Sequence, residues 1–114
     1  MKIGLFGKTF SEGFDQSIQQ LISEFEKGSC SFFVYEPFVK FLKKRVRFSS
    51  PIITFNRYED IAGKLDYLIS IGGDGSLLNT IMLIKDSGIP ILGINTGRLG
   101  FLAVAIQEHY PEPC

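Results

Sequence analysis

Short apolar runs alternate along the chain with segments in which apolar residues recur every three or four positions. The runs lie at residues 2–6, 31–35, 52–55, 68–71 and 91–94. Apolar, β-branched and aromatic residues in runs this short predict buried strands, and the periodic segments between them predict helices with one apolar face. Strands that alternate with helices in this way predict an α/β fold, with a parallel sheet that helices cover on both faces.

Start and stop signals support three of the predicted helices. The first helix has apolar residues at offsets of four, seven, eight and eleven from Phe14, and we expect it to end at Gly28. The second begins at Pro37, because proline suits the first turn of a helix. Asn56 and Glu59 resemble the pair of capping residues that opens a helix, which predicts a short third helix.

The second helix carries a basic face opposite its apolar residues. The basic residues are Lys40, Lys43, Lys44, Arg45 and Arg47. We interpret this face as solvated, because the chain has 12 basic and 12 acidic residues and one short basic run falls short of a nucleic-acid footprint. The composition therefore predicts no nucleic-acid partner.

Length and cysteine content narrow the class of protein further. The 114 residues suffice for one small domain with one core, and no apolar run approaches the length that a membrane span needs. Cys30 and Cys114 form neither a disulfide framework nor a metal-binding spacing. We therefore expect a cytoplasmic protein with no membrane partner and no metal ligands of its own.

The run at residues 68–71 breaks into glycines around one carboxylate, in the order Gly72-Gly73-Asp74-Gly75-Ser76. A helix is expected to follow from Ser76 to about Gly88. Its apolar side would comprise Leu77, Leu78, Ile81, Met82 and Ile84. A strand, a tight glycine turn and a helix N-terminus leave backbone N–H groups free to hold an anion.

Asp74 is the unusual member of this turn, because a carboxylate repels a bound phosphate. Three roles are open to it: an acceptor for a sugar hydroxyl, an outer ligand of Mg²⁺, or a helix cap. A second glycine-bearing loop, 95–100, follows the last predicted strand. Ligands of parallel sheets bind beyond the carboxyl ends of the strands, so we expect both loops to line one crevice.

The two glycine-bearing segments, in the order in which they occur, resemble two motifs of a known family. The GGDG segment at residues 72–75 resembles the signature shared by NAD kinases, diacylglycerol and sphingosine kinases, and phosphofructokinases. Residues 88–102 are similar to the NAD kinase form, in which a strand ends in Asn-x-Gly-x-Leu-Gly-Phe-Leu, whereas the lipid kinases carry a Gly-Thr-Gly-Asn type of loop there. The resemblance covers residues 2–103 and implies a Rossmann-like fold, that of the N-terminal domain of the NAD kinase and diacylglycerol kinase group.

The resemblance also implies a reaction, in which ATP or polyphosphate, with Mg²⁺ or another divalent cation, phosphorylates the adenosine ribose 2′-hydroxyl of NAD to give NADP. It implies that Asp74 is the catalytic residue that meets this hydroxyl. Arg98 would face the pyrophosphate or be a surface charge, and Phe101 would stack on adenine or be a core residue. The nucleotide contacts implied are Gly72, Gly73, Gly75, Ser76, Asn79, Asn95, Arg98, Leu99, Gly100 and Phe101.

Family members continue through a further all-β domain, which this sequence does not contain. We therefore expect a nucleotide-binding domain at residues 1–103 followed by an atypical tail at 104–114, inactive alone and part of a homo-oligomer when full length. Two other functions stay open. The chain could belong to another kinase of the GGDG group, acting on a lipid or sugar hydroxyl, or to a non-catalytic nucleotide-binding module.

Overall fold

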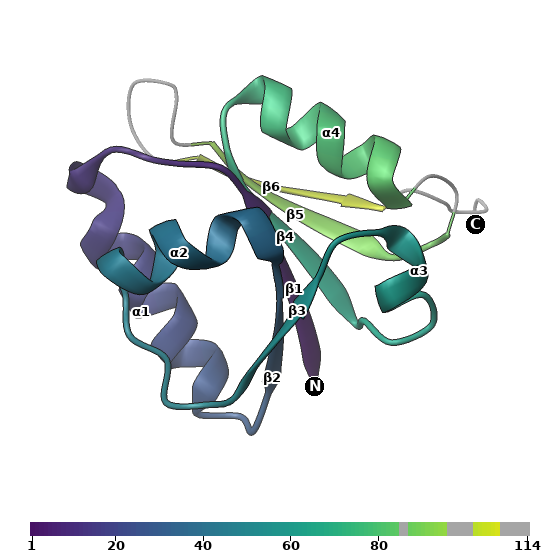
Figure 1. Ribbon diagram of the computed structural model, residues 1–114. Helices are drawn as coiled ribbons and strands as arrows, with labels where there is room; N and C mark the ends of the chain where they lie inside the picture. The colour runs from purple at the N-terminus through teal and green to yellow at the C-terminus, as the bar shows by residue number, and fades with distance from the viewer. Residues whose placement is uncertain (85–86, 96–101, 108–114) are drawn as a thin grey trace.

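The chain forms one six-stranded sheet with helices packed against both of its faces (Figure 1). The structure, a computed structural model, describes residues 1–84, 87–95 and 102–107. The strands are β1 (Lys2–Gly7), β2 (Ser31–Tyr35), β3 (Ile52–Phe55), β4 (Tyr67–Gly72), β5 (Pro90–Asn95) and β6 (Leu102–Gln107). The helices are α1 (Asp15–Glu26), α2 (Glu36–Arg45), α3 (Tyr58–Ile61) and α4 (Asp74–Ile84), with a 3-10 turn, η1, at Glu12–Phe14. Within the described ranges, no helix has both the length and the apolar character that crossing a bilayer requires.

The strand order is β3-β2-β1-β4-β5-β6, and the first five strands are parallel to their neighbours. These five are the strands that the apolar runs predicted. Strand β6 pairs antiparallel with β5 and was not predicted, since two of its six residues are alanine, which has little preference for strands. It runs across the boundary that we expected after residue 103. Residues 102–107 therefore form a strand because they pair with β5, although their own sequence does not clearly favour a strand.

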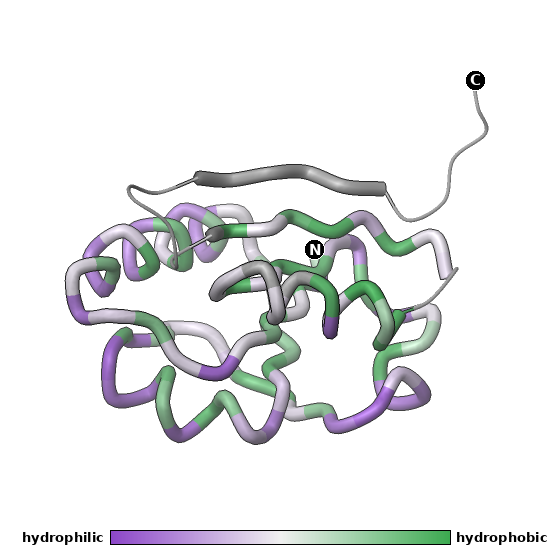
Figure 2. Tube along the Cα trace, turned by 90° about the horizontal axis from the view of Figure 1, so that it is seen from above, coloured by the Kyte–Doolittle hydropathy of each residue, from purple (hydrophilic) through white to green (hydrophobic). Residues whose placement is uncertain are grey.

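Apolar side chains fill a layer on each face of the sheet, because successive strand residues point to opposite faces. α1 and α2 cover one face, and α3 and α4 cover the other, which confirms the predicted arrangement (Figure 1). In Figure 2 the helical turns alternate between hydrophilic and hydrophobic residues, as expected for helices with one buried side. The fully buried residues of the first layer include Ile3, Leu5, Ile18, Phe32, Phe38 and Leu42. Those of the second include Phe55, Ile61, Leu68 and Ile91.

The start of α3 differs in detail from the prediction. We expected Glu59 to cap the helix together with Asn56, but the acid that does so is Asp60. Its Oδ2 accepts hydrogen bonds from the backbone N–H groups of Asn56, at 2.9 Å, and of Arg57, at 3.1 Å. The helix therefore begins one residue later than the predicted pair implied, and Asp60 stands at its third position.

Asp60 gives the stability of α3 a defined dependence on pH. The two backbone N–H donors lower the pKa of Asp60, because they stabilise its charged form. Since the folded-state pKa is depressed, this stabilisation is fully present above about pH 5 and is lost as the pH falls below about 3.9. We expect Asp60→Asn to lower the thermal midpoint at pH 7 and to flatten its decline in acid. Glu59→Gln is the matched control, and an equal effect there would contradict the assignment.

The end of α1 also differs from the prediction. Gly28 follows the helix as expected, and its N–H donates to the carbonyl of Phe25 at 3.1 Å. The residue with a left-handed backbone is the next one, Ser29, at a φ of 58°. A side-chain-bearing residue therefore makes the turn into β2.

Arg45 was predicted to lie on the solvated face of α2, and this prediction was wrong. Its Nη1 donates to Asp15 Oδ1 at 2.8 Å and to the carbonyl oxygen of Phe10 at 3.2 Å. The guanidinium carbon lies 4.4 Å from the centre of the Phe41 ring. Only 22% of the Arg45 side chain is exposed. Arg45 therefore ties the end of α2 to the start of α1, a tertiary contact that helical periodicity does not reveal.

We expect Arg45→Ala to lower the free energy of unfolding by about 2 kcal/mol, since it removes a charge-assisted pair, a hydrogen bond and a cation–π contact together. Lys44→Ala, one residue earlier on an exposed side chain, should change it by less than about 0.5 kcal/mol. Urea denaturation of both variants tests the difference. Equal changes in the two would show that the Arg45 contacts contribute nothing beyond helix propensity.

Candidate functional site

The glycine turn lies at the carboxyl end of β4, between β1 and β5 in the middle of the sheet. Gly72 is the last residue of β4 and Asp74 is the first residue of α4, so Gly73 alone separates strand from helix. The Ser76 N–H donates to the Gly73 carbonyl at 3.1 Å and closes the turn. The predicted order of strand, tight turn and helix is therefore confirmed, although α4 begins two residues before Ser76.

The backbone conformation at residue 72 requires glycine. Its φ of +144° lies in a region that residues with side chains rarely adopt. A Cβ at this position would also lie 2.6 Å from Ser76 Oγ and 3.0 Å from Ser76 Cβ. The chain can therefore leave β4 and enter α4 this abruptly only with glycine at residue 72.

Residues 73 and 75 are also glycine, but the backbone conformation and the packing do not require it. A Cβ built on either residue meets no described atom within 4 Å, and neither residue is among the glycines for which a positive φ is found. Gly75 is exposed and lies within α4, where alanine is the better helix former. The described part of the chain thus gives no packing reason for two glycines on the open side of this turn.

Some side chains near the turn are partly buried against the sheet, and others are exposed on the outer side of α4. The Ser76 side chain is partly buried against Gly72, while Asn79 is exposed one turn further along α4. Leu78 and Met82, which we expected on the buried side of α4, are 62% and 69% exposed. Two apolar side chains, about one helical turn apart, are therefore exposed on the outer side of α4.

The second loop starts next to the first. Gly72 and Asn95, the last residues of β4 and β5, are partners in the parallel register. Leu102, the first residue of β6, pairs with Asn95 from the other side. Asn95 and Leu102, the residues that flank segment 96–101, therefore lie at the carboxyl end of β5, next to the glycine turn.

Several predicted site residues lie outside what the structure describes. These are Arg98, Leu99, Gly100 and Phe101, in segment 96–101, together with the side chains of Asp74 and Asn95. The backbone of Asp74 begins α4 and that of Asn95 ends β5. Among the described residues, no three His, Cys, Asp or Glu side chains come together in a group that could hold a metal ion.

The sequence analysis missed a pair of buried hydroxyl groups beneath the turn. Ser70 on β4 and Thr80 on α4 are 2% and 0% exposed, and their Oγ atoms are 2.9 Å apart. The signal for both is a polar residue inside an apolar segment. Ser70 interrupts Leu68-Ile69-Ser70-Ile71, and Thr80 stands beside apolar residues of α4.

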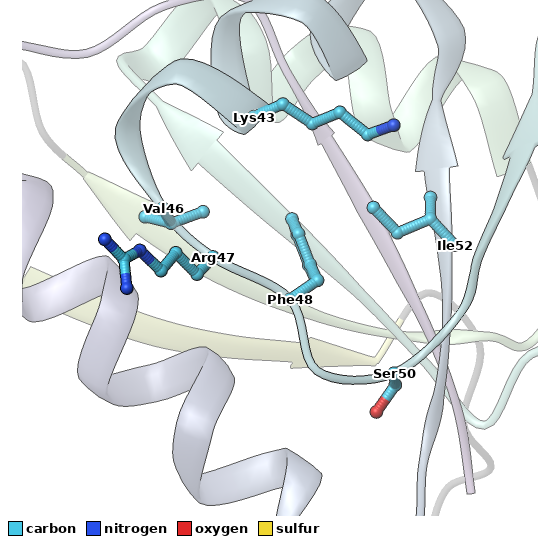
Figure 3. Close-up of a pocket in the computed structure, with 6 residues that line it drawn as sticks. All are labelled: Lys43, Val46, Arg47, Phe48, Ser50 and Ile52. Atoms are coloured by element: carbon cyan, nitrogen blue, oxygen red, sulfur yellow. The ribbon is translucent and has the colours of Figure 1, made fainter.

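A separate hollow of about 560 Å³ lies at the amino end of β3, the outermost strand on one side of the sheet (Figure 3). The side chains of Lys43, Phe48 and Ile52 reach toward a common space, while the guanidinium of Arg47 points away from it (Figure 3). The hollow shares no residue with the glycine turn. The two loops at the carboxyl edge are therefore the candidate functional site.

Comparison with known proteins identifies the family to which this arrangement belongs. Residues 39–113 match the model of the ATP-NAD kinase N-terminal domain, and the match includes both glycine-bearing loops. The NAD kinase of Flavobacterium psychrophilum is 36% identical over 109 residues, which cover 96% of this chain and 37% of that protein.

Two further relatives give the same result. The NAD kinase of Cytophaga hutchinsonii is 40% identical over 109 residues, covering 95% of this chain and 37% of that protein, and that of Bacteroides fragilis is 36% identical over 112 residues, covering 98% and 38%. The chain thus spans little more than a third of the length of these relatives. With a glycine turn at the central strand and a family match across two thirds of its residues, the chain belongs to the family of ATP-NAD kinase N-terminal domains.

Proposed function

We propose that the chain is the nucleotide-binding part of an NAD kinase, and that the whole protein transfers a phosphoryl group to the adenosine ribose 2′-hydroxyl of NAD to give NADP. The donor is ATP or polyphosphate. One observation carries the proposal: Gly73 and Gly75 leave the open side of the turn at β4 without side chains, in a chain of this family. A backbone without side chains lets a dinucleotide approach closely.

Asp74 acts on the attacking hydroxyl. An ordinary aspartate has a pKa of about 3.9 and is a weak base at neutral pH. The loose transition state of phosphoryl transfer needs little early deprotonation of the nucleophile, so accepting a hydrogen bond from the 2′-hydroxyl and aiming it is most of the work. The position of Asp74 at the first residue of α4, directly after the glycine turn, supports this role.

The nucleotide lies across the two loops. From the first loop it contacts Gly72, Gly73, Gly75, Ser76 and Asn79, and from the second Asn95, Arg98, Leu99, Gly100 and Phe101. The register pairing of Gly72 with Asn95 supports this assignment, because it brings the two loops to one edge of the sheet. Arg98 faces the pyrophosphate, and the ring of Phe101 stacks on the adenine.

Mg²⁺ or another divalent cation enters with the phosphoryl donor. Mg²⁺ usually binds through substrate phosphates and one or two carboxylates and keeps several waters. A single carboxylate at the turn, Asp74, fits such a site as an outer partner. The ion would supply charge neutralisation for the transferred phosphoryl group.

The rest of the site and the oligomer come from the part of the protein beyond this chain. The relatives are more than twice as long as the region they share with it, which supports a second domain that completes the dinucleotide site. We infer that the chain alone is inactive and that the full-length protein is a cytoplasmic homo-oligomer. The buried, free thiol of Cys30 is consistent with a reducing compartment.

Substrate profiling of the full-length protein tests the proposal. With ATP or polyphosphate as donor, we expect phosphorylation of NAD or NADH, and none of diacylglycerol or fructose 6-phosphate. Phosphorylation of a lipid or a sugar would assign the protein to another kinase of the GGDG group. Binding of NAD without any transfer would instead identify a non-catalytic nucleotide-binding module.

A further inference from the structure

Ser70 and Thr80 are the buried polar residues of the described core, and they face each other across the boundary between β4 and α4. Ser70 lies on the same face of β4 as Leu68, the face that α4 covers. A buried hydroxyl costs free energy unless it forms hydrogen bonds. Thr80 is the hydrogen-bond partner that the structure gives to the buried Ser70 hydroxyl.

The distances define a directional chain of hydrogen bonds. Thr80 Oγ1 lies 2.9 Å from Ser70 Oγ and 2.8 Å from the carbonyl oxygen of Ser76. Thr80 has one hydroxyl proton and a carbonyl can only accept, so both contacts are hydrogen bonds at once only if Ser70 donates to Thr80 and Thr80 donates to Ser76. The chain links β4 to the first turn of α4.

This link closes a loop that contains the candidate site. The residues between Ser70 and Thr80 include Gly72, Gly73, Asp74 and Gly75. Within the same loop, the Ser76 side chain packs directly on Gly72. The hydroxyl chain and this contact together determine how far α4 lies from the end of β4 and how it is rotated about its axis.

An apolar pair would fill the same space, but it would not specify one orientation, because apolar packing is non-directional and hydrogen bonds are not. We propose that Ser70 and Thr80 are positioning residues, which hold the start of α4 so that Asp74 meets the ribose hydroxyl. This inference rests on the proposed function for the chemical consequence, and on the two distances for the geometry.

The test compares three variants of the full-length protein. Thr80→Val keeps the shape of the side chain and removes the hydroxyl, and Thr80→Ser keeps the hydroxyl and removes the methyl group. We expect Thr80→Val to lower kcat for NADP formation about 10-fold with less than about a threefold change in KM for NAD, because displacement of a positioned group acts on the transition state. Thr80→Ser should stay within about threefold of the wild-type kcat. Thr54→Val, the same change at an exposed residue of β3, is the control.

Hydrogen exchange of the backbone amides at residues 76–80, beginning with the Ser76 N–H that is bonded to the Gly73 carbonyl, provides a readout that does not depend on activity. Faster exchange there in Thr80→Val and Ser70→Ala, with wild-type exchange in Thr80→Ser and Thr54→Val, would support the inference. Wild-type exchange in Thr80→Val, an unchanged kcat, or an equal loss in Thr80→Ser would overturn it. If the wild-type protein forms no NADP at all, the proposed function fails, and the exchange rates still decide whether the hydroxyl pair holds the turn.

Discussion

Asp74→Asn is expected to lower kcat for NADP formation by the full-length protein at least about 100-fold, while KM for NAD changes less than about threefold. Asparagine keeps the size of the side chain, but its neutral amide is a weaker hydrogen-bond acceptor than a carboxylate, presents two donors beside its one oxygen, and cannot take the proton that finally leaves the 2′-hydroxyl. In the proposed mechanism the carboxylate aims a hydroxyl that is already bound, so we expect its loss to act on the transition state more than on binding. Steady-state kinetics with NAD and ATP measure both constants.

The control for this variant is another change from acid to amide, Glu59→Gln, on the exposed surface of α3. It should leave both constants unchanged. Equal turnover by Asp74→Asn and the wild-type protein would remove Asp74 from the mechanism. Loss of folded protein in Asp74→Asn is excluded by comparing thermal midpoints before the kinetics are interpreted.

Gly75→Ala is expected to change stability and activity in opposite directions. A Cβ at residue 75 meets no atom within 4 Å, and the residue is exposed within α4, so alanine should raise the free energy of unfolding by about 0.5 to 1 kcal/mol. The same methyl group would stand between the backbone and the dinucleotide. We expect kcat/KM for NAD to fall about 100-fold, since a misplacement of about 1 Å can have an effect of this size.

Gly72→Ala gives the contrasting result at the other end of the turn. A positive φ and the 2.6 Å approach to Ser76 Oγ make alanine unfavourable there, so this variant should lose about 2 to 3 kcal/mol of stability. Denaturation curves on the two variants separate the glycine that the backbone requires from the one that tolerates a side chain, and NAD kinetics on Gly75→Ala test whether the dinucleotide approaches residue 75. Wild-type kcat/KM in Gly75→Ala would show that no ligand approaches the backbone at that residue.

Most of the fold could be predicted from the sequence, because its signals are local. Each central strand contains a short apolar run, and both faces of the sheet are buried, so all three of the consecutive residues Phe32, Phe33 and Val34 of β2 are apolar and buried. α1 has a clear apolar side, and Ile18 and Ile22 are buried as its periodicity predicts. The glycine turn was recognisable because a carboxylate among glycines is uncommon at the end of a buried strand.

The rotation of α4 could not be predicted, because the helix has apolar residues on nearly all sides. Leu78 and Met82 are exposed while Thr80 and Ile84 are buried, so a polar residue occupies the centre of the inner side. Residues 78 and 82 lie almost opposite residue 80 on a helix of 3.6 residues per turn. In this rotation Thr80 forms a hydrogen bond with Ser70, and such a tertiary contact leaves no periodic signal.

Strand β6 and the role of Arg45 escaped prediction for a related reason. Residues 102–107 become a strand by pairing with β5, and Arg45 finds its partners on α1 and on the segment before it. In both, a contact with another segment of the chain determines the structure, and helical or strand periodicity does not reveal that contact. Local pattern therefore predicts most of the elements, whereas contacts between elements decide that β6 forms and that Arg45 is partly buried.

The most direct test of the central claim is a crystal structure of the full-length protein with NAD bound. The quantity to measure is the distance between the nearer carboxylate oxygen of Asp74 and the 2′-oxygen of the adenosine ribose. We predict a hydrogen-bond distance of about 2.6 to 3.2 Å, with the dinucleotide against the backbone of Gly73 and Gly75. A carboxylate turned into the protein, or paired with a neighbouring cation while the ribose lies elsewhere, would contradict the account.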